Sequence, residues 1–483
     1  MKRVWFAAAI ATSVAIGTGL TGLKLLPANL TEVASSSFGS GAVGDGAVGD
    51  GAVGNTALGH YRGAIGFSER AIAEDNNAEA AESASVRLAH LKKGQALWRA
   101  AVERLGAIPQ DSELYERAVN KRLAYRDRLI ESDQKLAQAD QRLVADIVTE
   151  VETTLGRPSS EGASPVHVTL CQIAPEQKLE KEAPEKDVSK KEAAQPKKTE
   201  LKGRQKLNST VAVPKQKTDK PQKPREGVES KREPLELTAD GQLNPKQCRH
   251  FQGDTPMASA ASLIKLPIAV ALLAKIKREN LDLDDKLYIE PGNFTENSAG
   301  ASIEIGNEYP LRKVMAQMIQ ESDNVATNQL IDYLGYDAMN KTMRQLNYPQ
   351  TLIGHKLIGA EAAPADFGEG INQTTTNDIT AMMANIYGLN RPGDEEILTA
   401  LSNQQDWELG YEGLKAVRLQ AKWLGEKTGQ NNLVIATTMA MEVGQERYVL
   451  TVAIDEDSDI YALREIVGGV AAHLVTQGAL VTP

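Results

Sequence analysis

One segment most constrains what this chain can fold into. Residues 172–234 contain no aromatic residue and are rich in Lys, Glu, Gln and Pro. Such a stretch cannot bury enough apolar surface to offset the entropy lost on ordering. We therefore expect a disordered linker or insertion there, so the folded core must come from the residues on either side.

The charge balance separates this segment from the rest of the chain. Residues 172–234 carry 17 Lys plus Arg against 11 Asp plus Glu, a net +6, whereas the whole chain is at −10, which leaves −16 elsewhere. This balance excludes an overall basic nucleic-acid binder. Two cysteines, Cys171 and Cys248, exclude a four-Cys zinc site, and the six scattered His residues show no metal-ligand spacing. We expect chemistry without a metal or cofactor.

Residues 1–24 have the pattern of an export signal or a membrane anchor. Lys2 and Arg3 precede an uncharged run of twenty residues, 4–23, rich in Ala, Ile, Val and Gly. A retained anchor and a cleaved signal both stay open, and the anchor is favoured. Either one predicts an exported, periplasmic or extracytoplasmic protein, which the anchor would hold to the membrane by its N-terminus.

Two further parts precede the charged segment. Residues 25–67 include a Gly-rich five-residue repeat in triplicate at 41–55, which predicts a flexible spacer. Residues 68–151 show an apolar helical pattern broken at Pro109, which predicts an α-helical hairpin with an apolar stripe that includes Leu91, Trp98, Leu129, Leu136 and Leu143. The hairpin is interpreted as a stalk that buries its own stripe, and a partner-docking or self-associating coil stays open.

Residues 235–483 are long enough for one substantial core. The apolar stretch 262–276 predicts a buried helix with Ser262 at its start and Lys265 one turn on. Residues three apart share a helix face. A serine needs an adjacent base to act as a nucleophile, and a lysine with a lowered pKa can be that base. Alone, this pattern is weak.

Two more motifs follow in order. Ser322-Asp323-Asn324 lies between the helical stretches 311–319 and 325–334, and Lys427-Thr428-Gly429 precedes two β-rich runs, 433–443 and 448–455. The ordered set Ser-x-x-Lys, Ser-Asp-Asn and Lys-Thr-Gly resembles class A β-lactamases and penicillin-binding proteins. The resemblance extends from about Gln242 to the C-terminal helical stretch 463–475.

The resemblance implies an α/β (α+β) sandwich. Its antiparallel five-stranded sheet would carry flanking helices and stand beside an all-helical subdomain, with the cleft between them. In this chain that domain, 235–483, would follow the N-terminal anchor and the helical hairpin.

The resemblance also implies roles in acyl transfer. Ser262 would be the acylated nucleophile and Lys265 its general base. Ser322 would relay the proton to the leaving nitrogen. The implied reaction opens a β-lactam amide bond through an acyl-enzyme.

Substrate binding is implied for the remaining motif residues. Asn324 would hold the substrate's side-chain amide, and Lys427 and Thr428 would bind its carboxylate. The oxyanion hole would be formed by the backbone N–H groups of Ser262 and of Gln430, which follows Gly429. The expected partner is thus a small β-lactam or a cell-wall peptide that bears a carboxylate.

The sequence departs from the class A pattern in the loop 355–366. Class A enzymes deacylate through a loop Glu in a Glu-x-x-Leu-Asn pattern, whereas here Glu361 is followed by Ala-Ala-Pro-Ala. Glu361 is either the deacylation base or a solvated loop acid, and without a positioned base an acyl-enzyme persists. The alternatives are therefore a β-lactamase, a slower penicillin-binding DD-peptidase or esterase, and a catalytically silent cell-wall-binding module.

Residues 166–173 alternate Val166, Val168 and Leu170 on one face, and this pattern fits a first strand of the catalytic sheet. A family-like sheet needs two strands before the nucleophile helix, and 235–261 has room for one. The charged segment would then be an insertion in a hairpin, with Cys171 and Cys248 on paired strands. Under this hypothesis a chain starting at 235 is unstable and one starting near Ser164 folds. A linker between domains stays open.

Overall fold

The computed structural model describes residues 56–156, 164–173, 243–244, 246–296, 302–359, 362–456 and 459–480. The predicted anchor, the spacer up to residue 55 and the charged segment beyond Ile173 lie outside these ranges. Among the helices that the model describes, none is both long and apolar enough to cross a membrane.

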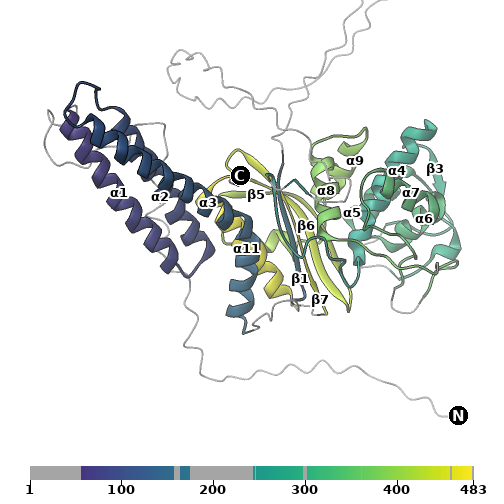
Figure 1. The fold of residues 1–483 in the computed structure, drawn as a ribbon. Helices are drawn as coiled ribbons and strands as arrows, with labels where there is room; N and C mark the ends of the chain where they lie inside the picture. The colour runs from purple at the N-terminus through teal and green to yellow at the C-terminus, as the bar shows by residue number, and fades with distance from the viewer. Residues whose placement is uncertain are drawn as a thin grey trace, which may run out of the picture.

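Three helices form an N-terminal bundle: α1 (Ala57–Ala80), α2 (Ala84–Gly106) and α3 (Tyr115–Thr154). Helix α1 packs along α2, and α2 packs along α3 (Figure 1). The sequence predicted a hairpin over 68–151, but helix begins at Ala57, where the Thr56 hydroxyl accepts a hydrogen bond from Gly59 N. The first predicted arm is also two helices, because Ser83 caps a new start at α2 through Val86 N.

A five-stranded antiparallel sheet forms the centre of the catalytic part and confirms the expected architecture. Its strands run in the order β2-β1-β7-β6-β5. Their bounds are β1 (Val166–Ile173), β2 (Cys248–Phe251), β5 (Ala421–Gln430), β6 (Val434–Val443) and β7 (Glu446–Asp455).

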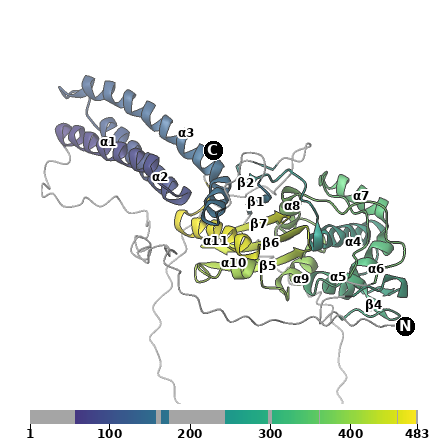
Figure 2. The same ribbon diagram turned by 90° about the horizontal axis from the view of Figure 1, so that it is seen from below.

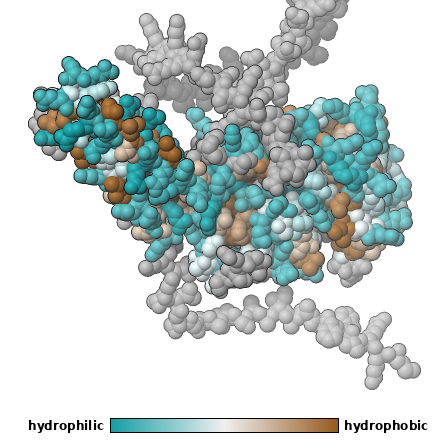
Figure 3. All heavy atoms as spheres, in the orientation of Figure 1, coloured by the Kyte–Doolittle hydropathy of each residue, from teal (hydrophilic) through white to brown (hydrophobic). Residues whose placement is uncertain are grey.

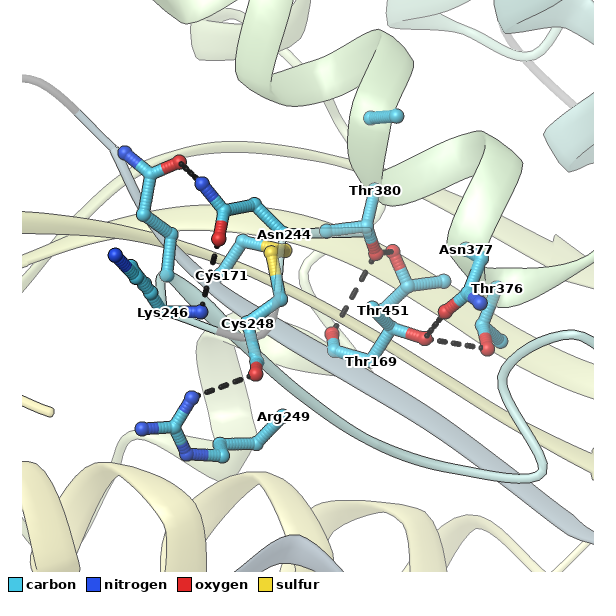
Figure 4. The surroundings of a disulfide bond; sticks show 12 residues. Thr169, Cys171, Asn244, Lys246, Cys248, Arg249, Thr376, Asn377, Thr380 and Thr451 are labelled. Carbon is cyan, nitrogen blue, oxygen red and sulfur yellow. Dashed lines mark hydrogen bonds between the residues drawn. A yellow bond between two sulfur atoms is a disulfide. The ribbon is translucent and has the colours of Figure 1, made fainter. Parts of the chain in front are cut away.

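Strand β1 pairs with β2 on one side and with β7 on the other. Val168 and Leu170 join the core on the outer face of the sheet, and Cys171 and Ile173 join the core on the inner face. Cys171 lies opposite Cys248 in the register and is joined to it by a disulfide (Figure 4). Residues 166–173 form the predicted first strand of the catalytic sheet. The charged segment therefore connects two neighbouring strands of one sheet and does not link two domains.

Helices cover both faces of the sheet, as Figure 2 shows from below. On the outer face lie α11 (Ile460–Gln477), the short α10 (Gly410–Gly413) and the C-terminal part of α3. On the inner face, α8 (Thr376–Tyr387) contacts the sheet directly.

The helical subdomain beyond α8 confirms the second half of the predicted architecture. It contains α4 (Lys265–Glu279), α5 (Leu311–Gln320), α6 (Asn324–Leu334), α7 (Tyr336–Gln345) and α9 (Asp394–Ser402). Short elements complete it: the 3-10 turns η2 (Ala261–Ile264) and η3 (Pro291–Asn293), and a ribbon of β3 (Lys286–Tyr288) with β4 (Glu308–Pro310).

Helix α3 extends from the bundle onto the sheet (Figures 1 and 2). Arg249 on β2 donates through Nε to Asp140 Oδ2 at 2.6 Å, and both side chains are buried. Leu143, Val144 and Ile147 of α3 belong to the outer core of the sheet. On the face drawn in Figure 3 the bundle surface is mostly hydrophilic, with scattered hydrophobic residues. Leu88, Leu91 and Leu136 are buried inside the bundle.

Candidate active site

Ser262 lies in η2, immediately before the buried helix α4. Ala261, which precedes it, has φ +41°, a left-handed conformation that costs an L-residue energy. Ser262 is half-buried, while Lys265, three residues on, is fully buried. Ser262 and Lys265 therefore lie one turn apart at the start of a buried helix, and the serine is the more exposed of the two.

Lys265 contacts the Ser-Asp-Asn motif at the start of α6. Its Nζ donates to Ser322 O at 2.5 Å, to Ser322 Oγ at 3.0 Å and to Asn324 Oδ1 at 2.8 Å. Ser322 has φ +55°. The Asp323 carboxylate caps α6 by accepting from Ala326 N at 2.8 Å, so Asp323 fixes the turn rather than entering the site.

Lys427 reaches the same hydroxyl from strand β5. Its Nζ donates to Ser322 Oγ at 3.1 Å and to Thr428 O at 2.7 Å. Ser322 Oγ therefore lies between two fully buried ammonium groups, one from α4 and one from the sheet.

Burial sets the protonation of these lysines. Burial is the largest cause that lowers the pKa of Lys265 well below its usual value, and the positive charge of Lys427 lowers it further. Burial also lowers the pKa of Lys427 to about 8, with the charges of Asp406 and Glu426 acting in the opposite direction. A lowered pKa makes the neutral amine of Lys265 more accessible, as a base for Ser262 requires.

The end of β5 approaches the nucleophile turn closely. A β-carbon at Gly429 would lie 3.2 Å from Ser262 N and 3.1 Å from Leu263 N, tighter than most such contacts. Gln430 is the last residue of the strand and is exposed. The glycine therefore lets the strand edge run beside the Ser262 amide, as an oxyanion hole shared by the Ser262 and Gln430 amides needs.

Hydrogen bonds join the two ends of the loop 352–373 to each other and fasten the loop to helix α6. Asn372 Oδ1 accepts from Gly354 N at 2.9 Å. Asn328 on α6 accepts from Leu357 N at 2.7 Å and donates to Leu357 O at 2.9 Å. Thr375 caps α8 by accepting from Asp378 N at 3.1 Å. The proposed deacylation base Glu361 lies outside the described residues.

The structure brings together most of the residues predicted for the site: Ser262, Lys265, Ser322, Asn324, Lys427, Thr428 and Gly429. It adds two carboxyl groups that the sequence did not indicate. Asp406 Oδ2 accepts from Thr428 Oγ1 at 2.7 Å. Glu426 precedes Lys427 on β5 and accepts from Thr437 Oγ1 at 3.0 Å, and burial raises its pKa to about 7.

Neither of these carboxyl groups belongs to a metal cluster. In the part of the chain that the model describes, no group of three or more His, Cys, Asp or Glu side chains is placed to hold a metal ion.

Residues 242–477 match the family model described as the beta-lactamase enzyme family. A curated relative, a beta-lactamase from Rhodobacter capsulatus, is 28% identical over 117 residues. That match covers 24% of this chain and 39% of the relative's own length.

Solved structures with similar folds include PBP-A, at 24% identity and a TM-score of 0.40, which covers 47% of this chain and 84% of its own. A mutant of PBP-A is described as an acyl-enzyme complex with penicillin G, with the same identity and coverage. The beta-lactamase from Sphaerobacter thermophilus DSM 20745 is 18% identical, with a TM-score of 0.45, and covers 70% of this chain and 98% of its own.

Proposed function

Residues 242–477 belong to the beta-lactamase enzyme family, and on that premise we propose that this chain is a serine hydrolase that forms an acyl-enzyme on Ser262. One observation carries the proposal. Ser322 Oγ lies 3.0 Å from Lys265 Nζ and 3.1 Å from Lys427 Nζ, so a chain of proton-carrying groups begins at Lys265, one turn after Ser262. Its substrate is a β-lactam or another acyl compound.

Acylation uses Lys265 as the base. Its neutral amine takes the proton from Ser262 Oγ as the oxygen attacks the carbonyl carbon. The proton then passes through Ser322 Oγ to the leaving nitrogen as the amide bond breaks. The backbone amides of Ser262 and Gln430 stabilise the oxyanion. Because the pKa of Lys265 is lowered, acylation increases as the pH rises through that pKa.

The fate of the acyl-enzyme separates a β-lactamase from a slow penicillin-binding peptidase or esterase. One contact of the loop 352–373 favours slow hydrolysis of the acyl-enzyme. Asn328 lies one helical turn beyond Asn324 and is bonded to both backbone groups of Leu357, whose partly buried side chain packs against the apolar core. The loop residue that is tied to the motif helix is therefore a leucine. A leucine cannot activate water. Rapid hydrolysis would need another base, for which Glu361 is the candidate.

Mass spectrometry of the intact protein after brief exposure to benzylpenicillin tests this proposal. We expect an adduct on Ser262 that persists for many minutes, and none in Ser262→Ala. Rapid loss of the adduct with drug turnover would indicate a β-lactamase. Absence of any adduct in the wild type would contradict the proposed chemistry and favour a silent cell-wall-binding module.

We also propose that the protein is exported and acts outside the cytoplasm. The basic pair and apolar run in residues 1–24 support this location. The disulfide between Cys171 and Cys248 supports it as well, since such bonds persist in oxidising compartments. Cell fractionation with thiol labelling tests it: recovery of the chain in the cytosol with both thiols reduced would contradict export.

A further inference from the structure

The hydroxyl expected to bind a substrate carboxylate is already bonded to a carboxylate of the protein. Thr428 Oγ1 donates to Asp406 Oδ2 at 2.7 Å. A hydroxyl has a single O–H to donate. A substrate carboxylate arriving at this edge therefore meets a second carboxylate instead of a free donor.

Asp406 is held in this position by its own segment. Its other oxygen, Oδ1, accepts from Glu408 N at 3.1 Å. The buried Gln404 accepts from Asp406 N at 3.3 Å and donates to Ile319 O at 3.1 Å. Gln405 N donates to Gln320 O at 3.0 Å. The segment is thus fixed to the end of α5, two residues before Ser322, and its carboxylate faces β5.

The charge of Asp406 reaches the other groups of this edge. It favours the protonated form of Lys427 and raises the pKa of Glu426, both through charge–charge interaction. Asp406 is itself exposed, so a bound substrate can contact it. Repulsion between two carboxylates at this edge would oppose the attraction of Lys427 for an anion.

We infer that Asp406 determines substrate specificity at the Lys427-Thr428 edge: it disfavours acyl compounds that bear a carboxylate there and favours those that present an N–H donor, such as a carboxamide. A carboxamide N–H can donate to Asp406, while its carbonyl accepts from Lys427. This inference rests on the proposed acylation of Ser262 and narrows its substrate class.

The test compares benzylpenicillin with its carboxamide, which share one ring and differ only at this group. Acylation rate constants are measured by intact mass for the wild type and for Asp406→Asn. We expect the wild type to favour the carboxamide. The variant should shift the acid-to-amide ratio toward the acid about tenfold or more, the size typical of losing an interaction with a charged group.

Glu408→Gln is the matched control. It removes one negative charge from the same segment and leaves the Asp406 contact with Thr428 in place, so the ratio should stay within about twofold of the wild type. Asp406→Ala repeats the test with no new amide, and thermal unfolding verifies that each variant is folded.

An unchanged ratio in Asp406→Asn, with both compounds still forming adducts, would overturn the inference and leave the proposed function standing. Slower acylation by the acid in the variant would also overturn it. Failure of both compounds to label the wild type would instead contradict the proposed function, and the inference with it.

Discussion

Ser322 combines a left-handed backbone with a hydroxyl that lies between two buried lysines. Its strain and its function can be separated by two substitutions. Ser322→Ala and Ser322→Gly both remove the hydroxyl, so both should slow acylation of Ser262 by about 10²–10⁴-fold. Glycine adopts φ +55° without the steric cost of a side chain, so the Gly variant should unfold with up to about 1 kcal/mol more free energy than the Ala variant. Urea unfolding and adduct formation measure the two effects, and near wild-type acylation in either variant would remove Ser322 from the relay.

Leu357 offers a direct test of why the acyl-enzyme should persist. Its backbone N–H and C=O are both bonded to Asn328, and a substitution of the side chain leaves these two backbone groups in place. Leu357→Glu should speed loss of the penicillin adduct by about 10²–10⁴-fold, because it supplies a general base for water. Leu357→Gln has the same length without the base and serves as the control. Equal adduct lifetimes in the two variants would show that this position does not face the hydrolytic water.

Glu426 should make stability depend on pH. Burial raises its folded pKa from 4.5 to about 7. The free energy of unfolding is highest with respect to this group below pH 4.5, where the carboxyl is protonated in both states. Between pH 4.5 and about 7 the unfolded chain has released the proton and the folded protein retains it, so the free energy of unfolding falls. The free energy of unfolding should fall by about 1 kcal/mol per pH unit across that window for this group. Asp378, whose pKa is raised to about 6, acts in the same direction, so the test is the difference between the wild type and Glu426→Gln. Parallel stability curves for the two proteins from pH 4.5 to 7 would contradict the assignment.

At this scale the sequence predicts motif residues well and their neighbours poorly. Ser262, Lys265 and Lys427 lie in short patterns whose order along the chain carries information. Asp406 meets Thr428 across 22 residues and Leu357 meets Asn328 across 29, and neither pair has a local signature. Such contacts are fixed by how α5, α6 and β5 come together, which no short pattern encodes.

Strand β1 is held in the sheet by a disulfide bond as well as by its backbone hydrogen bonds. The disulfide joins it to β2 across a sequence separation of 77 residues. Closing a loop of that length restricts the unfolded chain, and typical disulfides contribute about 2–4 kcal/mol. A Cys171→Ser and Cys248→Ser double variant should lose free energy of unfolding in that range, yet still be acylated at 25 °C, because neither sulfur enters the site. Urea unfolding with and without reductant measures the loss; a wild type insensitive to reductant while its thiols become reactive would contradict it.

Hydrophobic periodicity predicts the boundaries of some helices and not of others. The stretches 311–319 and 325–334 correspond to α5 and α6 within one residue at each end, since both have apolar faces and clear polar ends. The predicted start of the first helix, at residue 68, was wrong. Helix α1 begins at Ala57, within a Gly-containing stretch that resembles the preceding spacer. Its separation from α2 depends on the Ser83 cap, and a single serine in an Ala- and Glu-rich region is not a distinctive signal.

For the whole molecule, the unexpected feature is that α3 belongs to two cores. Its apolar stripe was predicted to be buried inside a hairpin. Leu136 does pack in the bundle with α1 and α2, whereas Leu143 packs in the outer core of the catalytic sheet. An amphipathic pattern predicts that one face is buried but not which surface covers it. Helix α2 reaches the same interface, since Ser85 contacts His473 and Lys92 donates to Gln477 O on α11.

This double role changes what truncation should do. A chain starting at Ser164 keeps β1. The sequence hypothesis predicted that this chain folds, because it contains the first strand. It would lose the cover that Leu143, Val144 and Ile147 give to the sheet. It would also lose the ion pair of Asp140 with Arg249, which joins α3 to β2. A chain starting at Ser112 keeps α3 and loses only the contacts of α1 and α2.

We therefore expect the Ser112 chain to fold and form the Ser262 adduct, and the Ser164 chain to be largely unfolded at 37 °C. Circular dichroism melts and penicillin labelling of both chains measure the difference. Replacing the ion pair by Arg249→Met with Asp140→Leu in the full chain is the control, because apolar substitutes of similar volume often preserve stability where a broken pair does not. Equal melting midpoints for the two truncated chains would mean that the sheet does not need α3 on its outer face.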